Sequence, residues 1–256
     1  MAEFEVSKWY CDCVDESGAV SILYTGTAKG SHGFRFHYSS LLEAGKSTIT
    51  HRSLRAATPP ELVGGGLRWR SKPLGIDAEW QADSQPVRAT VFSSAAGSIE
   101  WECLMPRAHA RLGTLTGFGY VERLTMTLAP WKLPLRTLRW GRFATASDWV
   151  VWIDWRGDYS TRLVFRNGEQ VAAVAVEDDG VDFADGARLA LAGPLEIRKG
   201  RLGATALAAI PGLRNSLPGR LLRIDECKWR SRARLVQPGR PVAEGFAIHE
   251  RVEWPE

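Results

Sequence analysis

The chain carries one short phrase twice, at positions separated by half of its length. Gly117–Arg123, with the sequence GFGYVER, returns 128 residues later as Gly245–Arg251, GFAIHER, in a chain of 256 residues. A second match, R-x-x-A-R-L, lies upstream of each phrase, at Arg107–Leu112 and Arg230–Leu235. Matches that keep their order at compatible offsets indicate an internal duplication. We therefore expect two similar halves.

A third and weaker match places the start of each half. Lys8–Tyr10 opens the first half, and Arg139–Arg142 opens the second. Two prolines interrupt any strand within 128–138, so the boundary is expected there. The predicted domains are 1–132 and 133–256.

Apolar and polar residues alternate along most of the chain, which is the pattern of half-buried strands. The predicted strands are 20–26, 34–38, 67–70, 76–80, 98–104, 148–156, 161–166, 170–176, 195–198 and 220–229. Arg166–Glu169 contains the Asn-Gly pair of a type I′ hairpin turn. The best helix candidates, 38–46 and 201–210, are short. Many short strands predict an all-β protein, either an antiparallel barrel or a sandwich.

The composition is that of a globular domain, with 45% hydrophobic and 24% charged residues. The eleven tryptophans supply either an ordinary core or the walls of a pocket for a flat or apolar ligand. No segment approaches the length of uninterrupted apolar sequence that a membrane span needs, and the first residues lack the pattern of a signal peptide. We expect no membrane span and a cytoplasmic protein.

The net charge is mild, at +4. The densest basic run, Lys228–Arg234 (KWRSRAR), places four basic residues at period two, so on a strand they share one face. This pattern is typical of a solvated outer face. A nucleic-acid or partner-binding strand is the weaker alternative, and we expect no nucleic-acid partner.

Cysteine and histidine spacing excludes the common metal sites. The four cysteines form neither a disulfide framework nor a zinc motif, and the five histidines show no ligand spacing. Fingerprints for phosphate loops, dinucleotides and the serine elbow are missing as well. We therefore expect no metal and no cofactor.

The repeated phrase also carries the main candidate for chemistry. On a strand, Tyr120 and Glu122 share the more apolar face, which we expect to point inward, and Glu250 takes the same place in the second copy. A carboxylate in an apolar interior must find a partner or bind a proton, so it is a candidate general acid. The alternative is a structural Glu–Arg clamp in each half, with Glu250 and Arg251 in the second. Duplication favours the clamp, because both halves share their scaffold.

Other candidates stand on the strands near the start of the second half. Trp140 and Arg142 alternate together, as do Trp152 and Asp154. Asp154 is either a catalytic acid between tryptophans or an outward residue beside a hairpin. His37 is either a surface residue or a polar group in a pocket.

Several of these segments resemble the hydroxyneurosporene synthase (carotenoid hydratase) and AttH-like family. Residues 7–26 are similar to its opening strand, E-W-W-Y-F-D, at Trp9, Tyr10 and Asp12. Trp140–Arg142 match its W-x-W-G-R strand, and Glu250 matches the acid of its C-terminal G-x-x-Y-x-E strand.

The central phrase resembles that family's G-Y-x-D-H-N-W-G segment but departs from it in its second half. Glu122 stands for the Asp, Arg123 for the His, and Leu124–Met126 (LTM) for the Asn-Trp-Gly, so the His-Asn pair is missing. These departures put hydratase chemistry in doubt and leave the acid and Tyr120 as carry-overs. The resemblance implies two consecutive lipocalin-like β-barrels with an apolar ligand cavity. It also implies metal-free chemistry on hydrophobic polyenes or prenylated compounds, because relatives include hydratases, cyclases and pericyclases.

The sequence thus predicts a cofactor-independent enzyme of the lyase or isomerase class, acting on a hydrophobic small molecule. Glu122 would donate or accept the proton, Tyr120 would be its hydrogen-bonding partner, and Arg142 would tune its charge or bind an oxyanion. The predicted pocket residues are Tyr10, His37, Trp140, Trp152 and Asp154. The alternative is a non-catalytic carrier of a hydrophobic ligand. The oligomeric state is not predicted.

Overall fold

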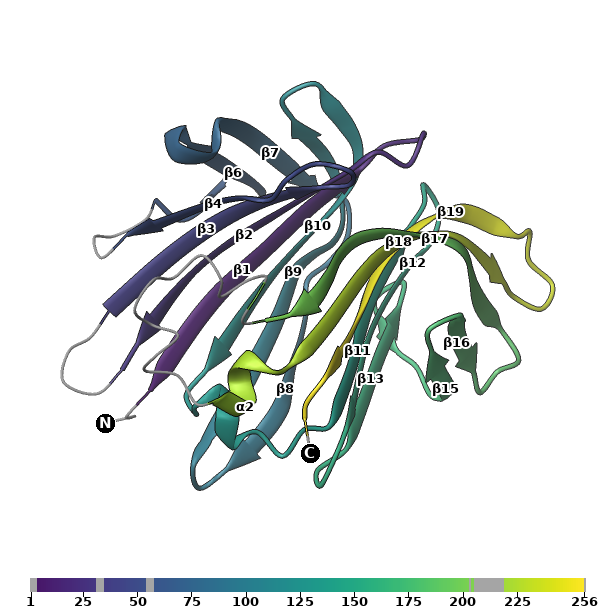
Figure 1. Cartoon of the computed structure of the whole chain (residues 1–256). Helices are drawn as coiled ribbons and strands as arrows, with labels where there is room; N and C mark the ends of the chain where they lie inside the picture. The colour runs from purple at the N-terminus through teal and green to yellow at the C-terminus, as the bar shows by residue number, and fades with distance from the viewer. Residues whose placement is uncertain (1–3, 31–34, 54–57, 203, 205–218, 256) are drawn as a thin grey trace. The chain divides into compact units, whose positions relative to one another are not determined.

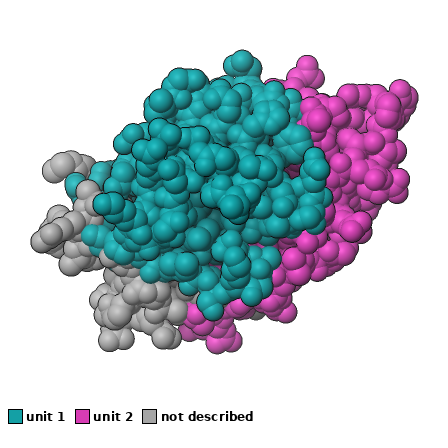
Figure 2. Space-filling model, turned by 90° about the horizontal axis from the view of Figure 1, so that it is seen from above, with its two compact units in different colours: residues 1–133 teal, residues 134–256 magenta. Residues whose placement is uncertain are grey.

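The structure is a computed structural model of the chain, and it describes residues 4–30, 35–53, 58–202, 204 and 219–255. Antiparallel strands dominate it (Figure 1), which confirms the all-β prediction. The chain divides into two compact units, residues 1–133 and 134–256, coloured separately in Figure 2. Each unit contains one curled antiparallel sheet.

The sheet of the first unit has the strand order β4-β3-β2-β1-β10-β9-β7-β6-β5, and β8 pairs with β9. Its strands are β1 (Glu5–Val14), β2 (Val20–Lys29), β3 (Arg35–Glu43), β4 (Ile49–Ser53), β5 (Glu61–Val63), β6 (Gly66–Ser71), β7 (Ile76–Ala82), β8 (Val87–Ser94), β9 (Gly97–Leu112) and β10 (Leu115–Met126). Two short 3-10 helices, η2 (Lys72–Leu74) and η3 (Pro130–Lys132), complete the unit.

The sheet of the second unit has the order β14-β13-β12-β11-β19-β18-β17-β16-β15. Its elements are β11 (Thr137–Ala144), β12 (Trp149–Arg156), β13 (Thr161–Arg166), β14 (Glu169–Gln170), β15 (Ala173–Glu177), β16 (Gly180–Phe183), β17 (Arg188–Arg201), α2 (Gly219–Leu222), β18 (Asp225–Val236) and β19 (Ala243–Glu253). The helix predicted over 38–46 is wrong, because most of that segment belongs to β3 and pairs with β2. Most of the helix predicted over 201–210 lies outside the described residues.

The two strand orders match position by position, which confirms the duplication. The repeated phrase occupies β10 in the first unit and β19 in the second. Gly117 pairs with Ala110, and Gly245 pairs with Ala233, so the two sequence matches face each other across the same strand pair in both units. The third match is shifted by one residue. Trp140 lies opposite Glu250 as Tyr10 lies opposite Glu122, so Trp140 corresponds to Tyr10 rather than to Trp9.

Each sheet curls around its own hydrophobic core. In the first unit, Leu23 of β2 and Trp69 of β6 belong to one buried cluster, although four strands separate β2 from β6 in the sheet. In the second unit, Val164 of β13 and Val176 of β15 share a cluster in the same way. Only the concave face of a curled sheet can bring such distant strands together. The sheets are half-barrels, since the two end strands of each order are not paired with each other within the described ranges.

The prediction that Glu122 points into this core is wrong. The first core contains Cys11 and Val121, which are the chain neighbours of Tyr10 and Glu122 and therefore project from the opposite face of their strands. The face that carries Glu122 is also buried: Tyr10 is 2% exposed on that face, and Cys11 is 0% exposed on the core face. Because both faces of the central strands are buried, alternation alone could not tell the core face from the other.

Two glycines of the central strands make room for the largest core side chains. A methyl group on Gly119 would lie 2.6 Å from the Trp80 ring, and a methyl group on Gly141 would clash with the Trp152 ring. Both tryptophans are buried core residues. Glycine at these positions therefore lets a tryptophan pack flat against the backbone of the sheet.

Candidate functional site

Strands β1 and β10 are neighbours, and each brings a tyrosine and an acid to the same face of the sheet. Tyr10 lies opposite Glu122, and Asp12 lies opposite Tyr120. Side chains that face each other on adjacent strands are about 4.5–5.5 Å apart at Cβ. Asp12 and Tyr120 are 0% exposed, and Glu122 is 9% exposed. These four residues, with Trp101 of β9, are called the acid cluster below.

Hydrogen bonds fix the orientation of both carboxylates. The Tyr120 hydroxyl donates to Glu122 Oε2 over 2.7 Å, and the Trp101 indole N–H donates to the same oxygen over 2.6 Å. The Tyr10 hydroxyl donates to Asp12 Oδ2 over 2.9 Å. Donors aimed at a carboxylate satisfy its buried oxygens and hold it in one orientation.

The groups around the two acids keep their protons. Burial raises the pKa of the Tyr120 phenol well above its usual value, and Cys103 and Glu122 add to the shift. Burial also raises the pKa of the Cys103 thiol, against a contact with Tyr120 that lowers it, and Glu122 and Asp12 raise it further. The pKa of Cys11 is raised by burial, then by Asp12 and Glu122. Near neutral pH the phenol and both thiols are therefore uncharged.

A backbone irregularity marks the first copy of the phrase and not the second. Opposite Glu122 stands Cys103, opposite Val121 stands Met105, and opposite Gly119 stands Ala108, so β9 contains extra residues beside Tyr120. In the second unit the register of β18 with β19 runs without a break from Asp225 to Leu235. Bulges re-aim side chains and are frequent beside active sites. The strand pairing is thus irregular beside Tyr120 in the first copy and regular at the corresponding position of the second copy.

In the second copy the glutamate forms an ion pair with a lysine, whereas Glu122 accepts hydrogen bonds from Tyr120 and Trp101. Glu250 binds Lys228, which is 0% exposed and stands where the first unit has Cys103. The ammonium group also lies over the Trp140 ring, 5.3 Å from its centroid. The residue that corresponds to Tyr120 is Ile248, which carries no hydroxyl.

Arg142 is a buried residue of the second unit. It is 1% exposed and lies on β11 opposite Ile248, on the same face as Trp140 and Glu250. The prediction that Arg142 acts together with Glu122 stays a prediction.

The clamp predicted within each phrase has different partners from those expected. Glutamate and arginine are adjacent in each phrase, so they project from opposite faces of the strand. Arg123 binds Glu102, with Nε to Oε2 at 2.9 Å. Arg251 binds Asp178. Glu250 forms an ion pair with Lys228 rather than with Arg251, and its predicted role as a structural clamp stays a prediction.

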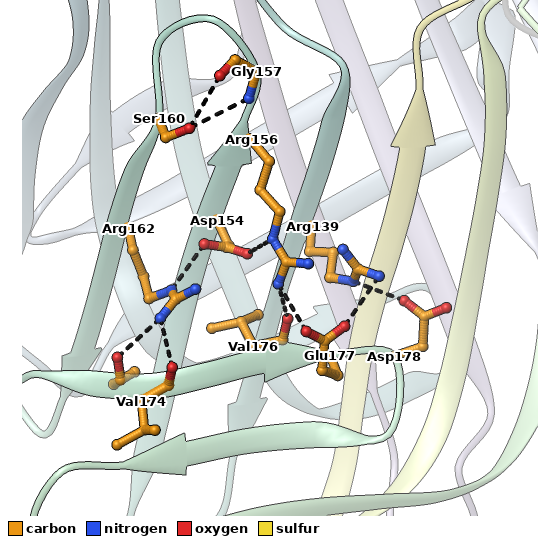
Figure 3. A network of polar contacts seen from close by, with 11 residues as sticks. Arg139, Asp154, Arg156, Gly157, Ser160, Arg162, Val174, Val176, Glu177 and Asp178 are labelled. Atoms are coloured by element: carbon orange, nitrogen blue, oxygen red, sulfur yellow. Dashed lines mark hydrogen bonds and ion pairs between the residues drawn. The ribbon is translucent and has the colours of Figure 1, made fainter.

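Asp154 belongs to a network of ion pairs (Figure 3). Its carboxylate is 3% exposed and accepts hydrogen bonds from Arg156 Nε over 2.6 Å and from Arg162 Nε over 2.8 Å. Arg156 continues to the carbonyl of Val176 over 2.6 Å, and Arg162 to the carbonyl of Val174 over 2.8 Å. Both carboxylate oxygens bind guanidinium groups that tie β12 to β13 and β15, and the predicted pocket role of Asp154 stays a prediction.

The structure separates the remaining pocket candidates. Trp140 shares a face with Glu250, whereas Trp152 belongs to the hydrophobic core on the other face. His37 is paired with Thr27 and lies on the core side of the first sheet, away from the face of Tyr10 and Glu122. The prediction that His37 and Tyr10 line one pocket is therefore wrong, because neighbouring registers place them on opposite faces.

Sequence reasoning missed Asp12 and Trp101 as site residues and misjudged Lys228. The signal for Asp12 was available, since Tyr10-x-Asp12 has the spacing of Tyr120-x-Glu122. The basic run was predicted to face solvent, but its first member, Lys228, is fully buried because Glu250 stands opposite. Arg232 and Arg234 are exposed, as predicted.

Among the described residues, no three His, Cys, Asp or Glu side chains are placed to hold a metal ion. Within the same residues, no helix has the length and apolar character needed to cross a membrane.

Solved structures with the same fold include three proteins that match this chain over nearly its whole length. Kievitone hydratase from Nectria haematococca gives a TM-score of 0.55 at 11% identity, over 96% of this chain and 88% of that protein. A putative AttH from Nitrosomonas europaea gives 0.55 at 7% identity, over 96% and 92%. CghA in complex with Sch210972 gives 0.52 at 11% identity, over 97% and 88%. The chain shares its fold with these proteins.

The comparisons by sequence find no relatives: no family model matches the chain, and no curated protein does. The double lipocalin-like fold is confirmed. The resemblance to AttH-like proteins holds at the level of the fold, and the resemblance to hydroxyneurosporene synthase stays a prediction.

Proposed function

We propose that the chain is a cofactor-independent lyase or isomerase that moves a proton on a hydrophobic small molecule, with Glu122 as its acid–base residue. The observation that carries the proposal is the hydrogen bonding of Glu122: a buried carboxylate held by the Tyr120 hydroxyl and the Trp101 indole, beside a bulge in β9. A buried acid oriented by neutral donors matches the needs of general acid–base catalysis.

The roles follow from the contacts. Tyr120 stays protonated because burial raises its pKa, so it donates to Glu122 and holds the carboxylate in one orientation. Trp101 does the same from β9. Asp12, oriented by Tyr10, supplies a second carboxylate on the adjacent strand. In this proposal Glu122 takes a proton from the substrate or returns one to it. Kievitone hydratase, which has this fold, is a hydratase by name and supports the choice of reaction class.

The test is incubation of the purified protein in heavy water with apolar alkenes and prenylated phenols, kievitone first. Mass spectrometry would detect a gain of one water, or carbon-bound deuterium in an isomerised product. We expect turnover by the native protein, and Glu122→Gln to lower the rate by about 10²–10⁴-fold, the usual contribution of a general acid or base. Circular dichroism would verify that the variant is folded.

Glu250→Gln is the matched control, because it changes the same atom in the duplicated strand. It should leave the rate near that of the native protein, since Glu250 serves an ion pair with Lys228. Equal losses in both variants, or full activity in a folded Glu122→Gln protein, would contradict the proposal. Saturable binding with no deuterium incorporation would identify a carrier instead.

A further inference from the structure

A second group of polar side chains lies on the concave face of the first sheet, opposite the face of the acid cluster. In one row across the strands, Ser7 of β1, Thr27 of β2 and His37 of β3 are consecutive partners in the register. In the next row, Thr25 is the partner of Ser39. These five residues are called the hydroxyl cluster. The hydrophobic core begins beyond them, at Cys11 and Leu23 on the same face.

Three residues of the hydroxyl cluster are buried, Ser7 and Thr27 are partly buried, and the cluster is partly hydrogen-bonded within itself. Thr25, Ser39 and His37 are 3%, 5% and 6% exposed. The Ser39 hydroxyl donates to Thr25 Oγ1 over 3.1 Å, and Thr27 Oγ1 lies 2.8 Å from His37 Nδ1. The other ring nitrogen, His37 Nε2, is buried and has no hydrogen-bond partner within the part of the chain that the structure describes. A buried polar atom left without a partner costs free energy, so it points to a group that binds there.

The second unit has charged side chains at the positions that correspond to three residues of the hydroxyl cluster. Matching the registers from Glu122 and Glu250 outward places Thr25 at the position of Asp154, Ser39 at that of Arg162, and Thr27 at that of Arg156. In the second unit these positions form the ion-pair network of Figure 3, and the two arginines reach backbone carbonyls of β15. The first unit has two short hydroxyl side chains where the second has two arginines.

We propose that the hydroxyl cluster is a binding site for a small polyhydroxylated molecule, a polyol or a monosaccharide, separate from the acid cluster. A ligand hydroxyl both donates and accepts, so it can pair with His37 Nε2 whichever ring nitrogen carries the proton. Serine and threonine hydroxyls on adjacent strands have the same two-way capacity.

Two further features fit this ligand class. Burial lowers the pKa of His37, with Arg35 contributing, so the imidazole is neutral near pH 7 and suits an uncharged ligand. Trp9 lies opposite Thr25 on the same face and is only partly buried. An indole beside a row of hydroxyls offers apolar contact to the ring carbons of a sugar.

The test is a titration of the full chain, labelled at histidine nitrogen, with myo-inositol, glucose and mannitol as probes. His37 would be assigned among the five histidines by the loss of its signal in His37→Gln. We expect a saturable change in the His37 Nε2 resonance with at least one probe. Thr27→Val and Ser39→Ala should each weaken that binding by about tenfold, the effect of one lost hydrogen bond.

Thr116→Val, at an exposed position of β10, is the control and should leave the binding unchanged. The titration of the native protein needs no substitution, so it tests the proposed binding site even if a variant fails to fold. The proposal is overturned if none of the three probes gives a saturable change. It is equally overturned if binding survives both Thr27→Val and Ser39→Ala, or if a high-resolution crystal structure soaked with the probes shows ordered water only on His37 Nε2.

Discussion

Burial lowers the pKa of one histidine in each unit, His37 in the first and His249 in the second. His249 is 4% exposed on the core side of β19, where Ser231 Oγ lies 2.8 Å from its Nε2 and the Trp229 ring lies 5.1 Å away between centroids. Burial lowers the pKa of His249 to about 4, with Lys228 acting in the same direction. The imidazole is therefore neutral in the folded protein at pH 7.

This pKa makes stability depend on pH in a defined window. The folded-state value of about 4 lies below the unfolded value of about 6.5, so between these limits the unfolded chain binds more protons. Stability contributed by neutral His249 is thus complete above pH 6.5 and is lost as the pH falls toward 4. We expect the free energy of unfolding of the native protein to fall by about 2 kcal/mol more than that of His249→Gln between pH 7 and pH 5.

Denaturant unfolding of both proteins at a series of pH values measures the difference. Carboxylates titrate in the same range, but they are common to the two proteins and cancel in the comparison. Parallel curves for the native protein and His249→Gln would show that His249 is protonated without cost in the folded state.

At the scale of elements, the network around Asp154 holds β15, the last strand of the second sheet, to β12 and β13 near the other end of that sheet. Its two arginines keep about a third of their side-chain surface exposed, at 33% and 35%, while the carboxylate is 3% exposed. Removal of one charge from a buried ion pair leaves the others unbalanced. The solvent that reaches the arginines moderates this cost.

We expect Asp154→Asn to lower the free energy of unfolding by about 3 kcal/mol, the lower end for a broken buried ion pair. Asp158→Asn is the matched control, because Asp158 and its partner Arg136 are both 74% exposed, and exposed pairs contribute about 0–1 kcal/mol. Denaturant titration of the two variants measures both changes. Similar losses in the two variants would mean that the network stabilises the unit no more than a surface pair does.

Local sequence signals predicted the elements better than they predicted the site. Asn167 and Gly168 have φ values of 52° and 97°, so the Asn-Gly turn between β13 and β14 forms as expected. Its determinant is local, because only these residue types readily adopt positive φ. The segment 38–46 was predicted as a short, weakly amphipathic helix, but pairing with β2 decides its conformation. Context from outside the segment overrides a weak local preference.

The acid cluster shows why the site was only half predictable. Tyr120 and Glu122 could be chosen from one strand, because their spacing puts them on one face. Their partners come from elsewhere: Asp12 stands on β1, more than a hundred residues earlier, and the bulge in β9 sets which of its residues meets Glu122. Register between distant strands and the place of a bulge depend on the packing of the whole sheet, which a single sequence does not encode in any local pattern.

At the scale of the whole molecule, comparison of the two duplicated units distinguishes the features that both share from those that only one unit has. Both units keep the strand order and the glutamate of the repeated phrase. In the second unit, Glu250 forms an ion pair with Lys228. Arg156 and Arg162 bind Asp154 at the positions where the first unit has hydroxyl side chains. The first unit has tyrosines, an indole and hydroxyls at the corresponding places. Under the proposed function, the features found in the first unit alone are the ones that would serve catalysis, and the features common to both units would serve the scaffold.

Because each unit has its own core, damage to one core should remain local. A methyl group on Gly141 would clash with the Trp152 ring in the second core, and overpacking of this kind costs about 1–3 kcal/mol. We expect Gly141→Ala to accelerate amide hydrogen exchange in β11, β12 and β19 and to leave β9 and β10 at native rates, measured by mass spectrometry of peptides. Gly219→Ala is the control, since its nearest contact would be Arg223 Nη1 at 3.5 Å, and should change neither unit. Equal acceleration in both units would show that the two cores open as one cooperative structure, because locally independent units exchange independently.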